Sequence, residues 1–456
     1  MNKNQSNAWI CPICGYVHYG SLPPEECPVC GTSQDMFEPY EDAAPTPEIE
    51  VSVDKKGVII VGAGVAGVSA AEALRKSAPE VEITLISNEP DLPYYRLNLT
   101  RYLIGELNLD QLLIHPESWY LENNIHLMRC AEVLRINLPG KEVELMDGKR
   151  IPYDQLILTV GSHPFIPPIL GVERKNVTTL RSLKDADFIL ENSLGMKRVV
   201  CIGGGLLGLE TAAAIARRGN EVSILEGQAW LLPRQLNEHA SMLLQKQVRS
   251  IGIDLYTGVR IREFVGDEAV TGVLLEDGTL VAADLVVISA GVRSNLEIAR
   301  QAGLQVKQGI LVDNTMRTSN QDIFTAGDAA EYDGVVYGIW GPSQIQGSIA
   351  GMVAGNQKIQ FQKIPRSNSL KVMGISLFSI GRVNPLEPSD IMIDGEIKGN
   401  YYCFIFNNNQ LVGSILLGEI SNSAKVKSLA ENKQDFRDIL LKKPVVNDLV
   451  NYIQNL

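Results

Sequence analysis

The stretch Val58-Ile59-Ile60-Val61-Gly62-Ala63-Gly64-Val65-Ala66-Gly67-Val68 decides how this chain folds. Its first four residues are all apolar and predict a buried strand of a parallel sheet. Gly62, Gly64 and Gly67 have the Gly-x-Gly-x-x-Gly spacing of a tight turn into a helix, here an Ala-rich helix over 69–76. Such a turn brings a pyrophosphate close to the backbone and to the N–H groups at the helix start. The stretch therefore predicts a dinucleotide site.

The same pattern recurs farther along the chain, at 198–218. Two fingerprints in one chain imply two bound dinucleotides. The strand after the second fingerprint ends at Glu226, an acid that would accept a hydrogen bond from a free ribose 2′-hydroxyl and repel a 2′-phosphate. Because no arginine follows directly, we expect this site to prefer NADH to NADPH. We assign to it Gly203, Gly205, Leu206, Leu207, Gly208, Glu210, Glu226 and Gly291.

The composition of the 456 residues is that of a globular protein large enough for three or four domains. The net charge of −12 argues against nucleic acid or an anionic membrane as a partner. The sequence contains no run of 18 apolar residues, and its first twenty residues lack the layout of a secretory signal. We therefore expect a cytoplasmic location.

Four of the seven cysteines form two Cys-x-x-Cys pairs near the N-terminus, Cys11 with Cys14 and Cys27 with Cys30. Four thiolates in a tetrahedral array suit either zinc or iron. A segment this short cannot bury enough apolar surface to fold alone, so the metal is expected to supply the folding free energy. The pattern predicts a metal site rather than disulfides.

The repeated Cys-Pro-x-Cys-Gly, together with Trp9, Tyr16 and Phe37, resembles rubredoxin. The short gap between the pairs is more similar to the compact rubredoxin-like domain of rubrerythrins, a resemblance that covers roughly residues 7–40. This resemblance implies iron, a one-electron carrier. The alternative is a zinc ribbon that never changes oxidation state.

The first fingerprint is followed by a predicted strand over 81–87, where an acid would bind the adenosine ribose. We assign that contact to Glu89. Farther on, 322–329 ends in a Thr-x-Gly-Asp turn. The order of these segments, with the second fingerprint inserted between parts of the first unit, resembles the FAD-dependent pyridine nucleotide-disulphide oxidoreductase superfamily over about 57–360.

This resemblance implies FAD in the first site and NADH in the second. It maps Asp328 onto the flavin ribitol or pyrophosphate, Trp340 onto the flavin edge, and Glu210 near the contact between flavin and nicotinamide. Glu210 is the one possible catalytic residue, and the alternative is an acid that pairs with its helix dipole. The FAD residues that we assign are Gly62, Gly64, Gly67, Glu89, Arg96, Val133, Gly161, Asp328 and Trp340.

Disulphide reductases of this type carry a Cys-x-x-x-x-Cys pair in the region of 93–105, and related peroxidases carry one cysteine there. This sequence has neither. No thiol is therefore available in that region to pass reducing equivalents from the flavin to a disulphide.

The predicted fold class is α/β, with two Rossmann-like domains and a small α+β domain, preceded by a rubredoxin-like metal domain. The expected boundaries are 1–41 for the metal domain, 42–56 for an acidic linker, 57–165 with 291–360 for FAD, 166–290 for NAD, and 361–456 for the C-terminal domain. The last resembles the small C-terminal domain of NADH:rubredoxin reductases and of the flavin part of nitrite reductases.

NADH gives up two electrons together, a tetrathiolate iron takes one, and a flavin converts between the two modes. The sequence therefore predicts a reductase of the NADH:rubredoxin type with its acceptor fused in front, passing electrons from NADH to FAD, to iron and on to a redox partner. One alternative is an NADH oxidase or peroxide-reducing flavoenzyme with a structural zinc ribbon. Another is that the cysteine pairs form a partner-docking module.

Charge suggests how the metal domain docks. Residues 1–42 carry one lysine against six acids, whereas residues 361–456 carry eleven Lys and Arg against nine acids. We expect the acidic domain to dock on a less acidic face that includes part of 361–456, and salt to slow internal electron transfer.

Overall fold

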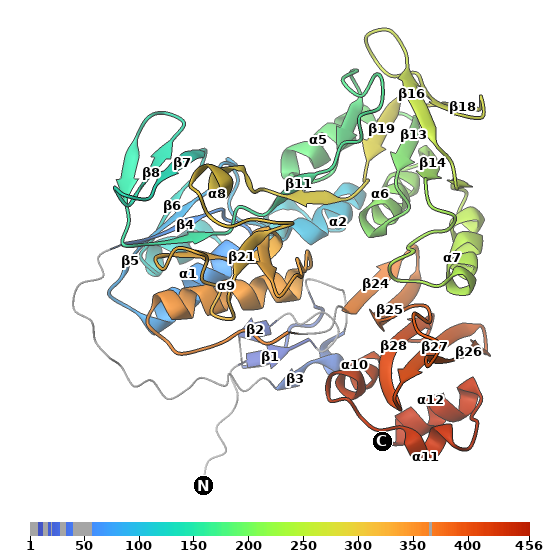
Figure 1. The fold of residues 1–456 in the computed structure, drawn as a ribbon. Helices are drawn as coiled ribbons and strands as arrows, with labels where there is room; N and C mark the ends of the chain where they lie inside the picture. The colour runs from blue at the N-terminus through green and yellow to red at the C-terminus, as the bar shows by residue number, and fades with distance from the viewer. Residues whose placement is uncertain (1–7, 12–16, 20, 28–32, 40–56, 364–366) are drawn as a thin grey trace.

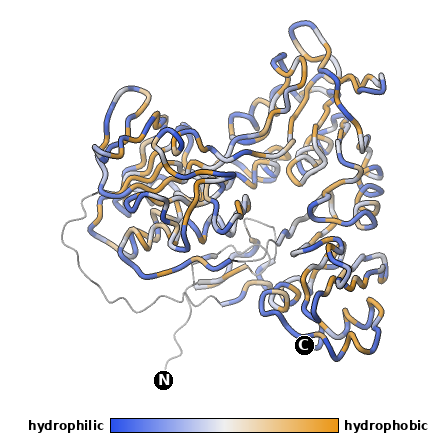
Figure 2. The backbone as a smooth tube through the Cα atoms, in the orientation of Figure 1, coloured by the Kyte–Doolittle hydropathy of each residue, from blue (hydrophilic) through white to orange (hydrophobic). Residues whose placement is uncertain are grey.

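The computed structural model of the chain describes residues 8–11, 17–19, 21–27, 33–39, 57–363 and 367–456. Figure 1 shows two α/β units side by side, with a C-terminal unit beneath the second. Hydrophobic positions run along the central strands of each unit, and most connecting loops are hydrophilic (Figure 2). Within the described ranges, no helix is long and apolar enough to cross a lipid bilayer.

The first unit is built on a five-stranded parallel sheet. In spatial order its strands are β22 (Ile323–Thr325), β10 (Gln155–Leu158), β4 (Gly57–Val61), β5 (Glu82–Ile86) and β6 (Ile125–Met128). The chain leaves the central β4 through the first fingerprint and enters α1 (Val65–Ser77). This helix begins four residues before the predicted segment because the glycine turn already has helical hydrogen bonding from Gly64 onward.

Helix α9 (Trp340–Ala354) crosses α1 at very short range. A Cβ at Gly347 or Gly351 would overlap the backbone carbonyl oxygens of Ala66 and Ala70 on α1. The two glycines therefore let the helices touch backbone to backbone, and this contact fixes the start of α9 beside the first fingerprint.

The second unit is inserted between β10 and β22 and repeats the architecture. Its parallel sheet has the order β12 (Val177–Thr179), β19 (Leu285–Ile288), β13 (Arg198–Ile202), β14 (Glu221–Glu226) and β15 (Asp254–Thr257). Its helices are α5 (Leu183–Asn192), α6 (Leu206–Arg217) and α7 (Glu238–Ser250). The chain passes between the units along β11 (Ser162–Pro164) and β20 (Val292–Ser294), which pair antiparallel.

Shorter elements surround the two sheets. The strands are β7 (Val133–Asn137), β8 (Glu142–Leu145), β9 (Arg150–Pro152), β16 (Ile261–Val265), β17 (Gly272–Leu275), β18 (Leu280–Ala282), β21 (Ile310–Val312) and β23 (Ala330–Tyr332). The helices and 3-10 turns are η2 (Arg96–Asn98), α2 (Leu99–Ile104), α3 (Leu109–Leu112), α4 (Glu117–Glu122), α8 (Glu297–Gln301) and η3 (Gly327–Ala329). Helix α2 ends at Ile104, with Gly105 in the left-handed conformation at φ 80°.

The C-terminal unit is an antiparallel sheet covered by short helices. Its strands follow the order β24 (Ser367–Val372), β25 (Ile375–Gly381), β28 (Gln410–Leu417), β27 (Asn400–Asn407) and β26 (Ile391–Ile397). Its helices are α10 (Ser423–Glu431), α11 (Arg437–Leu440) and α12 (Val446–Asn455). Asn237 Nδ2 of the second unit donates to the Tyr401 hydroxyl at 2.6 Å, which joins this unit to the second one.

The N-terminal unit is a small antiparallel sheet of β2 (Val17–Tyr19), β1 (Ala8–Ile10) and β3 (Glu38–Pro39), with the 3-10 turn η1 (Gln34–Met36). The α/β class with Rossmann-like sheets, an antiparallel C-terminal sheet and a small N-terminal unit is thus confirmed. The Rossmann-like sheets follow from the runs of buried aliphatic residues in β4, β10, β13 and β19.

Candidate dinucleotide and metal sites

The first glycine loop lies at the carboxyl ends of β4 and β10, where the strand order reverses. Gly62 has a φ of 105°, and a Cβ there would overlap the carbonyl oxygen of Thr159. A Cβ at Gly67 would overlap the carbonyl oxygen of Gly62, whereas no described atom lies within 4 Å of a Cβ at Gly64. Open crevices at such reversal points are where dinucleotides bind in α/β sheets, so the loop is a cradle for a phosphate group.

Thr159 holds this loop in place. Its hydroxyl donates to the carbonyl oxygen of Gly62 at 2.7 Å. It begins the turn Thr159-Val160-Gly161 at the end of β10. The neighbouring Gly161 has a φ of 64°, which places it in the left-handed region that a turn at this strand end requires.

Asp328, on η3, is fixed by side chains from β11 and the second unit. Its Oδ2 accepts hydrogen bonds from Ser162 Oγ at 2.7 Å and from Arg181 Nη2 at 3.1 Å. Arg181 also donates to Ser162 Oγ at 2.9 Å. Sequence reasoning missed Arg181, whose only local signal is its place directly before the capping serine of α5.

Glu89 and Arg96 are brought together as an ion pair. Arg96 Nη2 lies 2.5 Å from Glu89 Oε1, and the Tyr94 hydroxyl donates to Glu89 Oε2 at 2.6 Å. Arg96 also donates to the carbonyl oxygen of Arg181, which links this pair to the Asp328 cluster. The predicted ribose contact of Glu89 stays a prediction. Val133, at the start of β7, packs against the apolar cluster that includes Val61 and Ile86 of the first sheet, and its assignment to FAD stays a prediction.

The start of α9 carries polar atoms that the protein itself does not satisfy. Among the described residues, the Trp340 indole N–H, Gln344 Oε1 and Gln346 Nε2 are buried without a hydrogen-bond partner. Gln346 Oε1 accepts from the backbone N–H of Gly327 at 3.0 Å, so this side chain adjoins η3. Buried polar groups rarely lack partners, and three at the start of one helix fit a polar ligand such as FAD.

The second glycine loop repeats the first in detail. Gly203 has a φ of 108° and lies against the Ser289 carbonyl, and a Cβ at Gly208 would overlap the Gly203 carbonyl. Gly205 faces open space among the described atoms. The buried Ser289 hydroxyl, near Gly208, has no partner in the described part of the chain. These features fit a second dinucleotide.

The remaining predicted residues of the second site lie around this loop. Glu226 Oε2 accepts from the backbone N–H of Gly204 at 2.5 Å, and its Oε1 accepts from that of Gln228 at 2.6 Å. Leu206 and Leu207 form the start of α6, with Leu207 39% exposed. Gly291 is an exposed residue with a φ of 102°, between β19 and β20.

Glu210 lies where the two dinucleotide units meet. It projects from α6 to α2 of the first unit, where the Thr100 hydroxyl donates to its Oε2 at 3.3 Å. Burial raises the pKa of Glu210 to about 7, from the ordinary 4.5. A carboxyl group at this position therefore holds or releases a proton near neutral pH.

The structure describes two of the four cysteines of the predicted metal site. Cys11 and Cys27 are fully buried in one cluster with Phe37, against which Trp9, Met36 and Tyr95 pack. Cys14 and Cys30 lie outside the described residues, so within the described ranges no set of three or more possible metal ligands is present. Two buried cysteines together are the soft donors that zinc and iron prefer.

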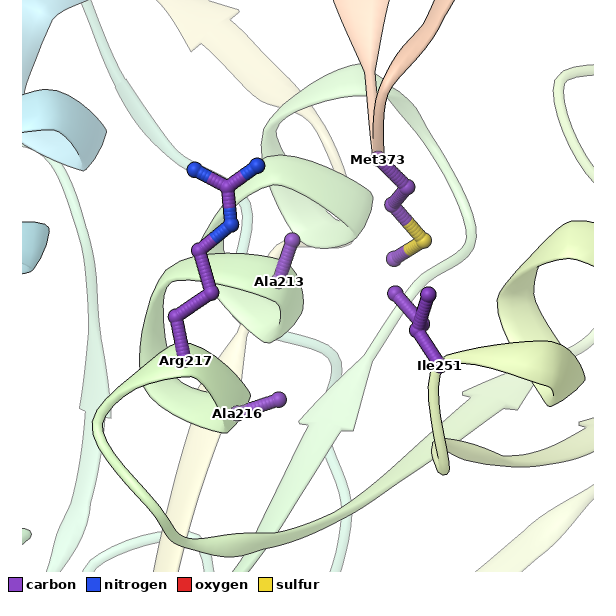
Figure 3. Close-up of a pocket in the computed structure, with 5 residues that line it drawn as sticks. All are labelled: Ala213, Ala216, Arg217, Ile251 and Met373. Carbon is purple, nitrogen blue, oxygen red and sulfur yellow. The ribbon is translucent and has the colours of Figure 1, made fainter.

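A cavity of about 160 Å³ lies outside both glycine loops, between α6 and the β24–β25 hairpin. Figure 3 shows the side chain of Met373, at the hairpin tip, extending toward Ile251 beside Ala213. Apart from Arg217, the lining is apolar. Gln247 Nε2 donates to the Met373 carbonyl at 3.2 Å, so this region is the joint between the C-terminal and second units.

Comparison with protein families identifies the central part of the chain. Residues 56–351 match the model described as pyridine nucleotide-disulphide oxidoreductase. This chain belongs to that family. On either side of the family region, residues 9–38 match the rubredoxin-like domain of rubrerythrin, and residues 367–434 match the C-terminal domain of rubredoxin NAD⁺ reductase.

Individual relatives of this family member agree with the assignment. The NADH-rubredoxin oxidoreductase of Clostridium acetobutylicum is 30% identical over 86% of this chain and 99% of its own length. The structure of an enzyme with that name from the same organism superposes with a TM-score of 0.74 at 29% identity, covering 87% of this chain and 99% of that one.

Two further matches extend the comparison. The nitrite reductase [NAD(P)H] of Bacillus subtilis is 36% identical over 84% of this chain, but this chain spans only 48% of that relative's length. The covalent putidaredoxin reductase–putidaredoxin complex gives a TM-score of 0.77 at 28% identity, over 83% of this chain and 93% of that one.

Proposed function

We propose that this chain is an NADH-dependent flavoprotein reductase that passes electrons through FAD to an iron bound by Cys11, Cys14, Cys27 and Cys30. The observation that carries the proposal is the packing of Tyr95 against the buried cluster of Cys11, Cys27 and Phe37. Tyr95 also contacts Trp340, a residue of the proposed FAD site, so the cluster that holds these cysteines lies near that site. The similarity to an NADH-rubredoxin oxidoreductase supports the same assignment.

The overall reaction follows from electron counting. Oxidation of one NADH to NAD⁺ releases two electrons and one proton, and a tetrathiolate iron accepts one electron at a time. Each NADH therefore reduces the iron twice, and a separate redox partner must take an electron after each reduction. FAD supplies the conversion between paired and single electrons. We place this reaction in the cytoplasm.

The residues of the chain bind and orient rather than react. The loop with Gly62, Gly64 and Gly67 would hold the FAD pyrophosphate against the start of α1. Asp328, held by Arg181 and Ser162, would accept hydrogen bonds from hydroxyl groups of the flavin ribitol. Trp340 would border the flavin. No nucleophile is needed, which agrees with the absence of a cysteine in 93–105.

In the second unit, the loop with Gly203, Gly205 and Gly208 would hold the NADH pyrophosphate, with Glu226 at the adenosine ribose. Glu210 lies between the units, where its carboxyl would border the nicotinamide and flavin. Since its pKa is raised to about 7 by burial, this residue would place little negative charge beside the flavin below neutral pH.

Metal analysis combined with visible spectroscopy tests the proposal. We expect stoichiometric iron and an absorption beyond the flavin bands that bleaches when NADH is added without oxygen. Cys14→Ser should abolish the bleaching of the absorption beyond the flavin bands and leave flavin reduction by NADH intact. Cys130→Ser is the matched control, because Cys130 is exposed and outside both pairs. Stoichiometric zinc, with only flavin bands responding, would overturn the iron pathway in favour of an NADH oxidase with a structural metal domain.

A further inference from the structure

We propose that the N-terminal metal domain docks on a surface of the first unit formed by Tyr95, Arg101 and Trp340, which we call the docking surface. Tyr95 acts there as a positioning residue that sets how closely the Cys11 and Cys27 side approaches the flavin edge. This inference rests on the proposed function for its purpose, but the position of the domain is testable without electron transfer.

The apolar part of the docking surface is an aromatic pair. The rings of Tyr95 and Trp340 lie 5.3 Å apart between centroids, at an interplanar angle of 31°. On its other side Tyr95 packs against the cluster of Cys11, Cys27 and Phe37. Tyr95 thus links the cluster that holds the buried Cys11 and Cys27 to the tryptophan at the start of α9.

The backbone around Tyr95 is held firmly. Its N–H donates to the carbonyl oxygen of Leu112 at 2.7 Å, and its own carbonyl accepts from Asn98 at 2.8 Å. Trp340 is equally constrained, since it begins the helix that is packed backbone to backbone on α1. A docked domain would therefore meet a preformed surface, which lowers the entropic cost of docking.

The polar part of the docking surface is an ion pair. Arg101 Nη2 on α2 lies 3.7 Å from Glu26 Oε1 of the metal domain. Two more guanidinium groups gather at the same end of α2: Arg218 donates to the Leu103 carbonyl at 3.1 Å, and Arg217 lies 3.4 Å from Glu106. Of these three groups Arg101 contacts the metal domain, and residues 1–42 carry one lysine against six acids.

The contacts with Tyr95 and Arg101 lie on the first unit, whereas the sequence-based hypothesis included part of 361–456 in the docking face. The contact with 361–456 stays a prediction. An exposed ion pair alone contributes about 0.2–1 kcal/mol. Because the domain is part of the same chain, its local concentration is on the order of millimolar, so weak contacts suffice.

A zero-length cross-link tests the docked position. Arg101→Lys, in a Glu106→Gln background that removes the neighbouring carboxylate, places an amine beside Glu26. Carbodiimide treatment of the purified, oxidised full-length protein should then join position 101 to Glu26 within one chain, as read by peptide mass spectrometry. Adding Glu26→Gln should abolish this link.

A positive control lies in the same unit. Arg129 and Glu117 form an exposed ion pair at 3.3 Å, so Arg129→Lys should cross-link to Glu117 under the same conditions. If that control link forms and the link to Glu26 does not, the docking proposal is wrong whatever metal the chain binds. If the link to Glu26 forms in a zinc protein, the docking stands and the electron pathway fails.

Charge reversal adds a kinetic readout. Glu26→Arg and Arg101→Glu should each slow bleaching of the iron absorption by roughly three- to fivefold, and the double variant should recover most of the rate. Reduction of the flavin by NADH should be equal in all four proteins. Equal slowing in the double variant would contradict the pairing, because a merely structural role would not be rescued by the swap.

Discussion

The two glycine loops have nearly the same geometry but different surroundings. Gly62 and Gly203 have φ values of 105° and 108°, and each lies under a carbonyl of the neighbouring strand end, Thr159 or Ser289. Around the first loop, α9 packs directly on α1 and contributes Trp340 and two glutamine atoms that have no partner among the described residues. The glycine spacing therefore specifies a dinucleotide cradle, and the covering elements specify which dinucleotide fits.

The acids Glu226 and Glu89, assigned to the two riboses, also differ in their surroundings. Glu226 accepts two backbone N–H groups of its own loop region, from Gly204 and Gln228. Glu89 is instead engaged by side chains, those of Tyr94 and Arg96. The second acid is a fixed part of its loop, whereas the first belongs to a network that continues through Arg96 to Arg181.

The largest effect on cofactor binding should come from substituting the third glycine of each loop, because each variant should impair only one of the two dinucleotide sites. Gly67→Ala should yield protein that loses FAD on purification, since its Cβ would meet the rigid backbone at Gly62. Gly208→Ala should keep FAD but raise the KM for NADH by more than about tenfold, a loss of roughly 1.4 kcal/mol. Flavin absorbance and steady-state kinetics measure these outcomes.

The control for these variants is Gly57→Ala, because no described atom lies within 4 Å of a Cβ at Gly57. The Gly57→Ala protein should retain FAD and keep the wild-type KM for NADH. Loss of FAD from the Gly208→Ala protein would contradict the assignment of separate ligands to the two loops.

Glu226→Arg should change the coenzyme preference and so distinguish the two acids. Removing the carboxylate takes away the acceptor for a 2′-hydroxyl, and the added cation attracts a 2′-phosphate. We expect the ratio of kcat/KM for NADH to that for NADPH to fall by at least about tenfold. Glu89→Gln, made at the corresponding place of the first site, should leave this ratio unchanged. A shift of coenzyme preference by the Glu89 variant instead would reverse the assignment of the loops.

The last comparison concerns Glu210, at the boundary of the two units, and it is measured as stability rather than as cofactor binding. Its folded-state pKa of about 7 exceeds the ordinary 4.5, so the folded protein holds this proton more tightly than the unfolded chain. Wild-type stability should therefore fall as pH rises from about 4.5 to 7, by at most about 3 kcal/mol. Glu210→Gln removes the ionisable group and keeps the oxygen that accepts from Thr100.

Thermal unfolding measures this difference. Glu210→Gln should melt close to the wild type at pH 5 and several degrees above it at pH 8. The exposed Glu221 supplies the control, because Glu221→Gln makes the same chemical change without removing a buried carboxyl. A Glu210→Gln protein whose advantage is the same at both pH values would show that the carboxyl is ionised in the folded state.

Local patterns predicted the parts of the site that depend on neighbouring residues. The sequence predicted the glycine turns, the strands before them and the position of Glu226 at a strand end. It could do so because each turn conformation is set by a few consecutive residues. The sequence did not predict the roles of Arg181 and Gln346. Their partners, Asp328 and Gly327, lie far away or in a different element, and only the packing of the second unit and of α9 brings them together.

The sequence alone determined that this chain has two dinucleotide loops and two cysteine pairs, because glycine conformations and thiolate chemistry are properties of short segments. The tertiary structure alone decided which face of the first unit meets the metal domain. Tyr95 is separated from Cys11 and from Trp340 by long stretches of chain, so their contact depends on the folding of α9 across α1 and on the placement of Glu26 near Arg101. Such contacts arise from the burial of surfaces between units, which no local pattern encodes.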